Sequence, residues 1–125
     1  MSSAWLIRRF IDPKARFSFA DKPTARGKQI PFDMYGVAFG HQGDACTFET
    51  LTRHYKIADP AVRHISRIVH DLDLKDDKFQ AAETSAVGAL VEGLRQMYSN
   101  DQELLREGIK MFEALYQSIS KKPAL

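Results

Sequence analysis

Residues 40–49 carry more polar functional groups than a scaffold requires. They read Gly-His-Gln-Gly-Asp-Ala-Cys-Thr-Phe-Glu and include His41, Cys46 and Glu49. Glycines on both sides of His41 let the backbone approach a ligand closely. Cys46 or Thr47 is expected at a helix start, where unpaired N–H groups and the helix dipole favour an anion and lower the pKa of a thiol. The alternative for Cys46 is a small buried hydrophobic residue, and Glu49 is alternatively a capping or surface acid.

A second polar segment, residues 68–76, reads Ile-Val-His-Asp-Leu-Asp-Leu-Lys-Asp at the end of a predicted helix. A spacing of three places His70 and Asp73 on one helix face, whereas the adjacent Asp71 points elsewhere. Imidazole and carboxylate groups suit zinc, iron or manganese. We therefore predict His41, Glu49, His70, Asp71 and Asp73 as metal ligands. The alternative is an ordinary polar helix end, since no tight His/Cys ligand signature is present.

Two adjacent arginines near the amino terminus could bind a tetrahedral oxyanion. Arg8 and Arg9 offer the bidentate donors that suit such an anion. Alternatively, they pair with Asp71, Asp73 or Asp76. Together with Cys46, the two arginines are the predicted ligand-binding residues.

Composition places the chain among ordinary globular proteins. It has 125 residues, of which 44% are hydrophobic and 27% charged, and a net charge of +2. No apolar run approaches the ~20 residues of a membrane span, and the single cysteine favours a reducing, cytoplasmic location. Residues 1–30 hold seven basic and two acidic side chains. Such a basic end could attract an anion or a nucleic acid, or it is a solvated surface. No basic recognition helix is present, and we do not expect direct DNA binding by this chain alone.

The pattern of apolar residues predicts a short first helix, then strands, then further helices. A short helix capped by Ser2 or Ser3 ends at Asp12. The alternation of Phe17 and Phe19 predicts a half-buried strand over residues 15–20, and residues 30–39 predict one or two more. Helices are expected over residues 47–55, after the Asp59 cap, over residues 87–97 and after an Asn100 cap. The predicted fold is one helix-rich α+β domain over residues 1–125, with short amino-terminal strands followed by about four helices.

Three segments together resemble a known family. Residues 4–17, 40–49 and 68–76 are similar, in order, to three signatures of the ChrB carboxy-terminal domain family of bacterial chromate-resistance proteins. The resemblance extends from Ala4 to about Ser118. Family members typically have Cys-Pro where this chain has Ser3-Ala4, so a cysteine role at that place does not carry over.

The resemblance implies a role in chromate resistance or chromate sensing. The residues that it carries over by motif are the ones singled out above: Arg8, Arg9, His41, Cys46, Glu49, His70, Asp71 and Asp73. We rank first a binding module for an oxyanion such as chromate or for a divalent transition metal. A metal-dependent enzyme using the same residues comes second, and an interaction scaffold third. A homodimer is left open.

Overall fold

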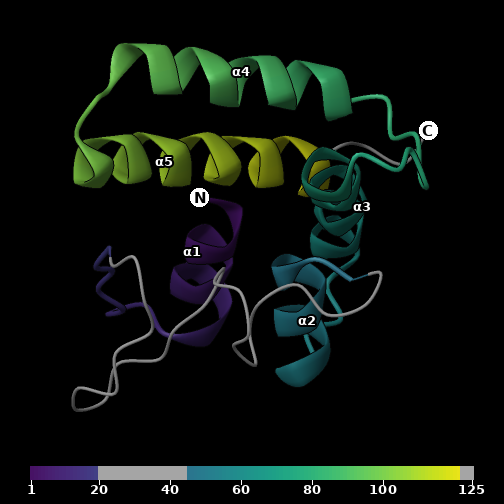
Figure 1. The fold of residues 1–125 in the computed structure, drawn as a ribbon. Helices are drawn as coiled ribbons and strands as arrows, with labels where there is room; N and C mark the ends of the chain where they lie inside the picture. The colour runs from purple at the N-terminus through teal and green to yellow at the C-terminus, as the bar shows by residue number, and fades with distance from the viewer. Residues whose placement is uncertain (20–44, 122–125) are drawn as a thin grey trace.

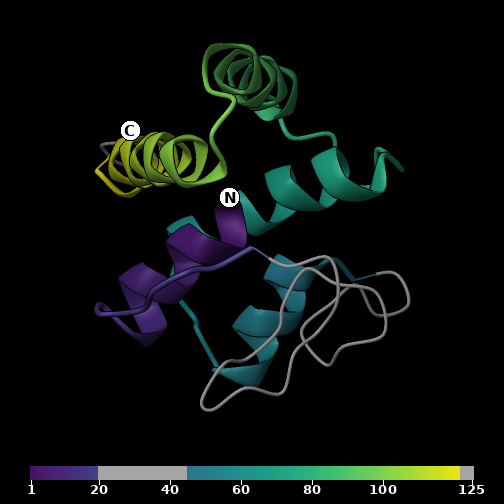
Figure 2. The ribbon, with the colours of Figure 1, turned by 60° about the vertical axis from the view of Figure 1, so that its left-hand side comes forward.

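The computed structural model describes residues 1–19 and 45–121, which form an assembly of helices. In chain order the elements are α1 (Ser2–Leu6), the wider π-type turn η1 (Ile7–Ile11), α2 (Thr47–His54), α3 (Pro60–Leu74), α4 (Thr84–Met97) and α5 (Asp101–Ser120). Figures 1 and 2 show α4 and α5 lying side by side, with α4 outermost. Helix α1 packs against α2 and α5, and α3 packs against α2, α4 and α5.

The predicted α+β class is wrong, because the described residues contain helices and no β-strand. Over residues 15–19 the backbone carbonyls of Ala15 and Phe17 accept hydrogen bonds from side chains instead of from a neighbouring strand. Arg8 Nη2 donates to the Ala15 carbonyl at 3.0 Å, and Gln102 Nε2 donates to the Phe17 carbonyl at 2.9 Å. Without a ladder partner, the alternation of Phe17 and Phe19 produces no half-buried strand, and Phe19 is exposed. The strands predicted within residues 30–39 lie outside the described residues.

The predicted helix starts at Asp59 and Asn100 are confirmed. Asp59 Oδ1 accepts from the N–H groups of Ala61 and Val62 at 2.8 and 3.2 Å, and proline occupies the first turn. Asn100 Oδ1 accepts from the Glu103 N–H at 3.0 Å. The serine cap predicted for the first helix is wrong. That helix begins at Ser2 without a side-chain cap, and Ser3 is buried in it.

Trp5 joins three helices in the core. Its ring stacks on Phe48 of α2 at 6.3 Å between centroids and lies 6.5 Å from Phe112 of α5. The buried indole also donates through Nε1 to Glu113 Oε1 at 3.0 Å, which satisfies its polar edge. Trp5 therefore fixes how α1 meets α2 and α5.

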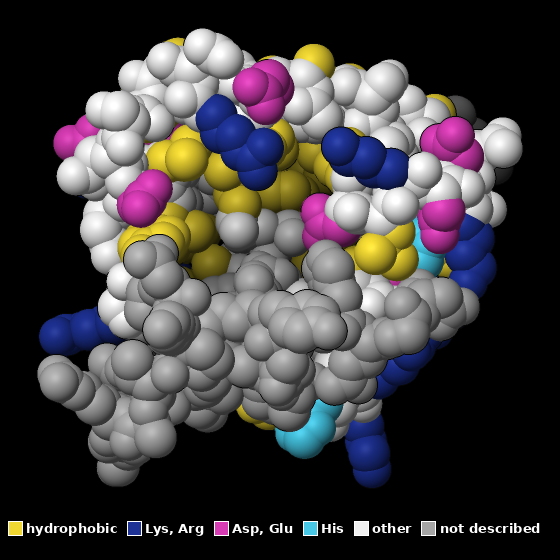
Figure 3. All heavy atoms as spheres, in the orientation of Figure 1, with side chains coloured by type: hydrophobic (Ala, Val, Ile, Leu, Met, Phe, Trp, Pro, Cys, Tyr) yellow, Lys and Arg dark blue, Asp and Glu magenta, His cyan; other side chains and the backbone are white. Residues whose placement is uncertain are grey.

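Helix α4 is rich in apolar side chains and poorly covered. Val87 is its buried residue, whereas Leu90 and Met97 are 58% and 70% exposed. Hydrophobic side chains also gather in a hollow on the face drawn in Figure 3. None of the described helices is long and apolar enough to cross a membrane.

Truncating a core ring should be far more costly than truncating an α4 leucine. We expect Phe112→Ala to lower the free energy of unfolding by about 3–5 kcal/mol, because the ring is buried against Trp5. Leu90→Ala should cost less than about 1 kcal/mol, since much of its side chain already contacts water. Urea titrations followed by circular dichroism measure both values. Equal losses in the two variants would contradict this view of the core.

Candidate functional site

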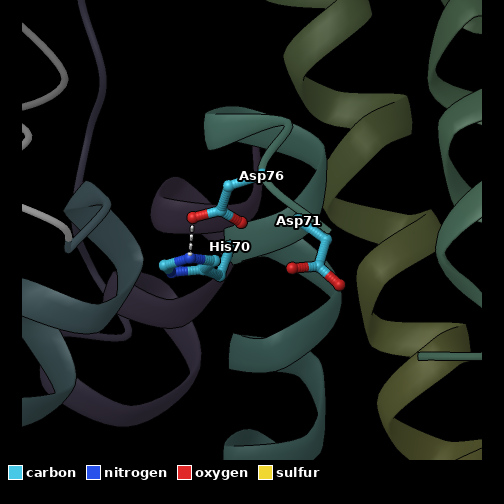
Figure 4. Close-up of side chains that lie close together, drawn as sticks. All are labelled: His70, Asp71 and Asp76. Carbon is cyan, nitrogen blue, oxygen red and sulfur yellow. Dashed lines mark hydrogen bonds and ion pairs between the residues drawn. The ribbon is translucent and has the colours of Figure 1, made fainter. Parts of the chain in front are cut away.

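A buried histidine forms the centre of the candidate site. His70 lies in the last turns of α3, and its side chain is 0% exposed. Its Nδ1 lies 2.5 Å from Glu49 Oε1, and its Nε2 lies 2.9 Å from Asp76 Oδ2. Figure 4 shows Asp76 over the His70 ring and Asp71 to one side of the pair. Both ring nitrogens are therefore bound to carboxylates from different parts of the chain.

Glu49 reaches His70 because it belongs to the cap of α2. Cys46 is the residue before this helix, and its N–H donates to Glu49 Oε1 at 3.0 Å. The Glu49 N–H in turn donates to the Cys46 side chain, which completes a capping box. Glu49 is thus both a capping residue and the hydrogen-bond partner of the buried imidazole.

Asp76 reaches the same ring because the chain reverses after α3. Lys75 ends the helix in the left-handed conformation, with φ of 54°. Asp77 and Gln80 also have positive φ, an uncommon conformation for residues other than glycine. The buried Asp71 carboxylate holds this segment by accepting from the Phe79 N–H at 3.2 Å and the Gln80 N–H at 2.7 Å. The turn therefore depends on Asp71 and returns Asp76 to His70.

Among the described residues, His70, Asp71 and Asp76 form a group able to hold a metal ion. Their ligand atoms all lie within 4.8 Å of one another. One imidazole and two carboxylates make a donor set that suits zinc, iron or manganese. Glu49 is hydrogen-bonded to the other ring nitrogen, Nδ1. Carboxylates commonly bind this second nitrogen of a histidine whose first nitrogen binds a metal.

The charges of the site are coupled through His70. Burial alone disfavours a charged imidazole, but the hydrogen bonds to Glu49 and Asp76 outweigh it and raise the pKa of His70. Burial likewise works against a charged Glu49, yet the Cys46 N–H and His70 outweigh it and lower the pKa of Glu49. The hydrogen bond from His70 also lowers the pKa of Asp76. A charged ring between carboxylates is the state that these contacts favour.

Cys46 does not have the reactive character expected from its place at a helix start. Burial, together with the charges of Glu49 and Asp73, raises the pKa of its thiol to about 12. The helix N–H that binds its sulfur does not overcome these effects. The predicted lowering of the pKa is therefore wrong, because desolvation and nearby carboxylates outweigh the helix dipole.

The other predicted ligands have different partners or lie outside the described residues. Arg8 donates to Ala15 and lies over the Phe17 ring, with 5.0 Å between guanidinium carbon and ring centroid. Arg9 pairs with Glu113 at 3.2 Å, not with the acids at the end of α3. Asp73 is exposed on α3, near enough to Cys46 for its charge to act on the thiol. His41 lies outside the described residues.

Asp76 is a site residue that the sequence did not mark as a ligand. The sequence suggested it only as a partner of the arginines. Asp76 lies six positions after His70, and a continuous helix would not bring the two together as a direct pair. The contact arises from the left-handed Lys75, for which the sequence offers no clear signal.

The Glu49–His70 pair should make stability depend on pH in the metal-free protein. Because the pKa of His70 is raised in the folded protein, His70 contributes its full stabilisation at pH values below its ordinary pKa of 6.5. This contribution is lost as the pH rises through the raised pKa. Because the pKa of Glu49 is lowered in the folded protein, Glu49 stabilises the fold at pH values above its ordinary pKa of 4.5. This contribution is lost as the pH falls through the lowered pKa. We expect Glu49→Gln to cost about 1.5–3 kcal/mol between those two values and less at alkaline pH.

Urea unfolding over a pH series measures this difference. Glu92→Gln removes an equal charge from an exposed position on α4 and serves as the control, with little loss at any pH. A Glu49→Gln penalty that stays constant well into the alkaline range would show that His70 does not become charged in the folded chain.

Comparisons with known proteins agree with the resemblance seen in the sequence. The family described as "ChrB, C-terminal domain" matches residues 1–119. Protein ChrB of Cupriavidus metallidurans is 34% identical over 122 residues, which cover 96% of this chain but 37% of that relative. No solved structure matches the chain. The chain belongs to the ChrB carboxy-terminal domain family of chromate-resistance proteins.

Proposed function

We propose that this domain serves chromate resistance as a binding module for a divalent transition metal, namely zinc, iron or manganese. His70, Asp71 and Asp76 are the proposed ligands. The observation that carries the proposal is the His70 ring, buried between carboxylates that come from α2 and from the turn after α3. Chromate sensing would then proceed through the bound metal; iron or manganese could report redox stress, whereas zinc has no redox chemistry.

Each side chain has a distinct part in the proposed site. Glu49 accepts from Nδ1 and so directs Nε2 toward Asp76, which fixes the ring orientation. Asp71 is held by two backbone N–H groups and keeps the turn folded over the ring. The Asp76 side chain is 42% exposed, so solvent reaches one of the proposed ligands. Because ligation requires His70 to release its Nε2 proton, metal affinity should rise with pH.

The charge of this cluster favours a cation over chromate. Glu49, Asp71 and Asp76 surround or adjoin a single imidazole, and Asp73 lies near the adjacent thiol. A doubly negative oxyanion would be repelled by these carboxylates. The Cys46 thiol stays protonated at neutral pH, so it is a poor nucleophile or reductant. An oxyanion site at Arg8 and Arg9 remains a separate prediction.

The alternative of a metal-dependent enzyme has less support from the contacts. A catalytic site needs an open position beside the reacting group, whereas the His70 side chain is completely buried and packs edge-on against Phe79 at 5.0 Å. A cytoplasmic location is part of the proposal, because Cys46 is a free, buried thiol. A homodimer stays a prediction.

Replacing Asp76 tests the proposal without disturbing the core. We expect untagged protein purified without chelators to bind about one transition-metal ion per chain. Asp76→Asn should weaken manganese or zinc binding by at least about tenfold, because one proposed ligand loses its charge. Isothermal titration and elemental analysis measure the two quantities.

Asp77→Asn is the matched control. Asp77 is the next residue, is exposed and has positive φ, which asparagine tolerates. It lies outside the ligand group, so its variant should bind metal as the wild type does. Absence of metal binding by the wild type, or equal losses in the two variants, would reject the proposed site and leave the scaffold role in its place.

A further inference from the structure

Trp5 and Tyr116 form a pair of oxidisable side chains in the core. Their ring centroids lie 5.5 Å apart, and the two residues are 1% and 9% exposed. Trp5 belongs to α1 and Tyr116 to α5, two helices that pack together (Figures 1 and 2). Indole and phenol rings lose a single electron far more readily than a phenylalanine ring does. Because the rate of electron transfer falls steeply with separation, rings in contact can exchange an electron rapidly.

Each ring of this pair has a carboxylate at its acidic hydrogen. Trp5 Nε1 donates to Glu113 Oε1 at 3.0 Å, and the Tyr116 hydroxyl donates to Asp59 Oδ2 at 2.7 Å. Loss of an electron makes these N–H and O–H groups strongly acidic, so a base within hydrogen-bond reach assists the oxidation. Burial works against a charged Asp59, but its hydrogen bonds outweigh this effect and lower the pKa of Asp59. The phenol proton therefore has an ionised acceptor in place.

The other neighbours of Tyr116 favour a neutral radical over a charged one. The Arg9 guanidinium carbon lies 5.1 Å from the Tyr116 ring centroid. A cation over the ring disfavours a second positive charge on it, so the electron should leave together with the proton. The hydrogen bond to Asp59 raises the pKa of Tyr116, which keeps the proton on the phenol until the electron leaves. These contacts couple the oxidation of Tyr116 to proton transfer.

We propose that Tyr116 gives an electron to oxidised Trp5, so that the pair is an internal electron donor of this domain. A one-electron oxidant takes an electron from Trp5, and the indole proton moves to Glu113. Tyr116 then passes one electron to Trp5 and its phenol proton to Asp59, while Trp5 recovers its own proton from Glu113. The products are intact Trp5, a neutral Tyr116 radical and protonated Asp59. The inference goes beyond the proposed metal site and does not depend on it.

The position of the pair indicates what the transfer protects. The Trp5 ring stacks on Phe48, the residue before Glu49, and Glu49 accepts from the backbone of the buried Cys46. Because a neutral tyrosyl radical has a lower free energy than a tryptophanyl radical, the electron passes from Tyr116 to Trp5. Transfer therefore moves an oxidising equivalent from the α2 side of the core to α5, away from the thiol. Chromate is itself a strong oxidant, so a domain that serves chromate resistance meets oxidants of this class.

Laser photoionisation tests the proposal with the whole chain. Light at the long-wavelength edge of protein absorption ejects an electron from Trp5, the single tryptophan of the chain. Nitrous oxide removes the ejected electron, and tert-butanol removes the hydroxyl radical that results. We expect the tryptophanyl absorption band to decay as a tyrosyl band rises, at a rate independent of protein concentration. In Tyr116→Phe, the tyrosyl band should be lost and the tryptophanyl band should persist.

Two further variants separate this pair from a general effect of tyrosine. Tyr98→Phe removes a phenol at the end of α4 that has no ring contact with Trp5 in the described part of the chain, and it should behave as the wild type. Asp59→Asn keeps a good cap on α3 but removes the base, so the tyrosyl band should rise at least about tenfold more slowly. Circular dichroism checks that each variant is folded.

Three results would overturn the proposal. The first is the absence of a tyrosyl band in the wild type, and the second is an equal tyrosyl yield in Tyr116→Phe. The third is a rate that rises with protein concentration, because the transfer would then run between molecules. An unchanged rate in Asp59→Asn would overturn the assignment of Asp59 as the proton acceptor.

Discussion

The need to satisfy a buried imidazole governs how the described part of this protein is assembled. His70 is withdrawn from water, so each ring nitrogen requires a protein partner. Glu49 comes from the start of α2 and Asp76 from the turn after α3. These two contacts fix the start of α2, the end of α3 and the left-handed turn relative to one another. A shift of any of them would leave a buried polar group unpaired, which is costly.

The opposite end of α3 is fixed by a different pair. The Tyr116 hydroxyl donates to Asp59, the residue that caps α3, so α5 holds the helix where it begins. Tyr116 also lies 5.5 Å from Trp5, whose ring stacks on Phe48 of α2. Helix α3 is therefore held at both ends by polar contacts, and the aromatic core packs the helices that provide them.

The burial of acids also explains where the carboxylate groups of this protein gather. Glu49 and Asp71 are drawn inside to bind His70 and the turn, which makes the His70 cluster rich in carboxylate groups. The same burial removes their charge from the outer surface of α2 and α3, where Arg53, Arg63 and Arg67 remain exposed. The carboxylate-rich cluster thus arises from the packing of α2 and α3, although residues 47–74 carry equal numbers of basic and acidic side chains.

The sequence by itself determined the features that depend on near neighbours. The Asp59-Pro60 and Asn100 starts were predictable because caps act within three residues, and the ordered segments identified the family. It also marked Glu49, His70 and Asp71 as chemically significant. Tertiary structure decided the rest. The Phe17–Phe19 alternation gave no strand because a strand needs a distant partner, and Cys46 lost its thiolate character through burial. Asp76 reaches His70 because the chain reverses after α3, and this reversal is stabilised by contacts with His70 and Asp71. Such contacts depend on tertiary packing and cannot be read from the spacing of residues.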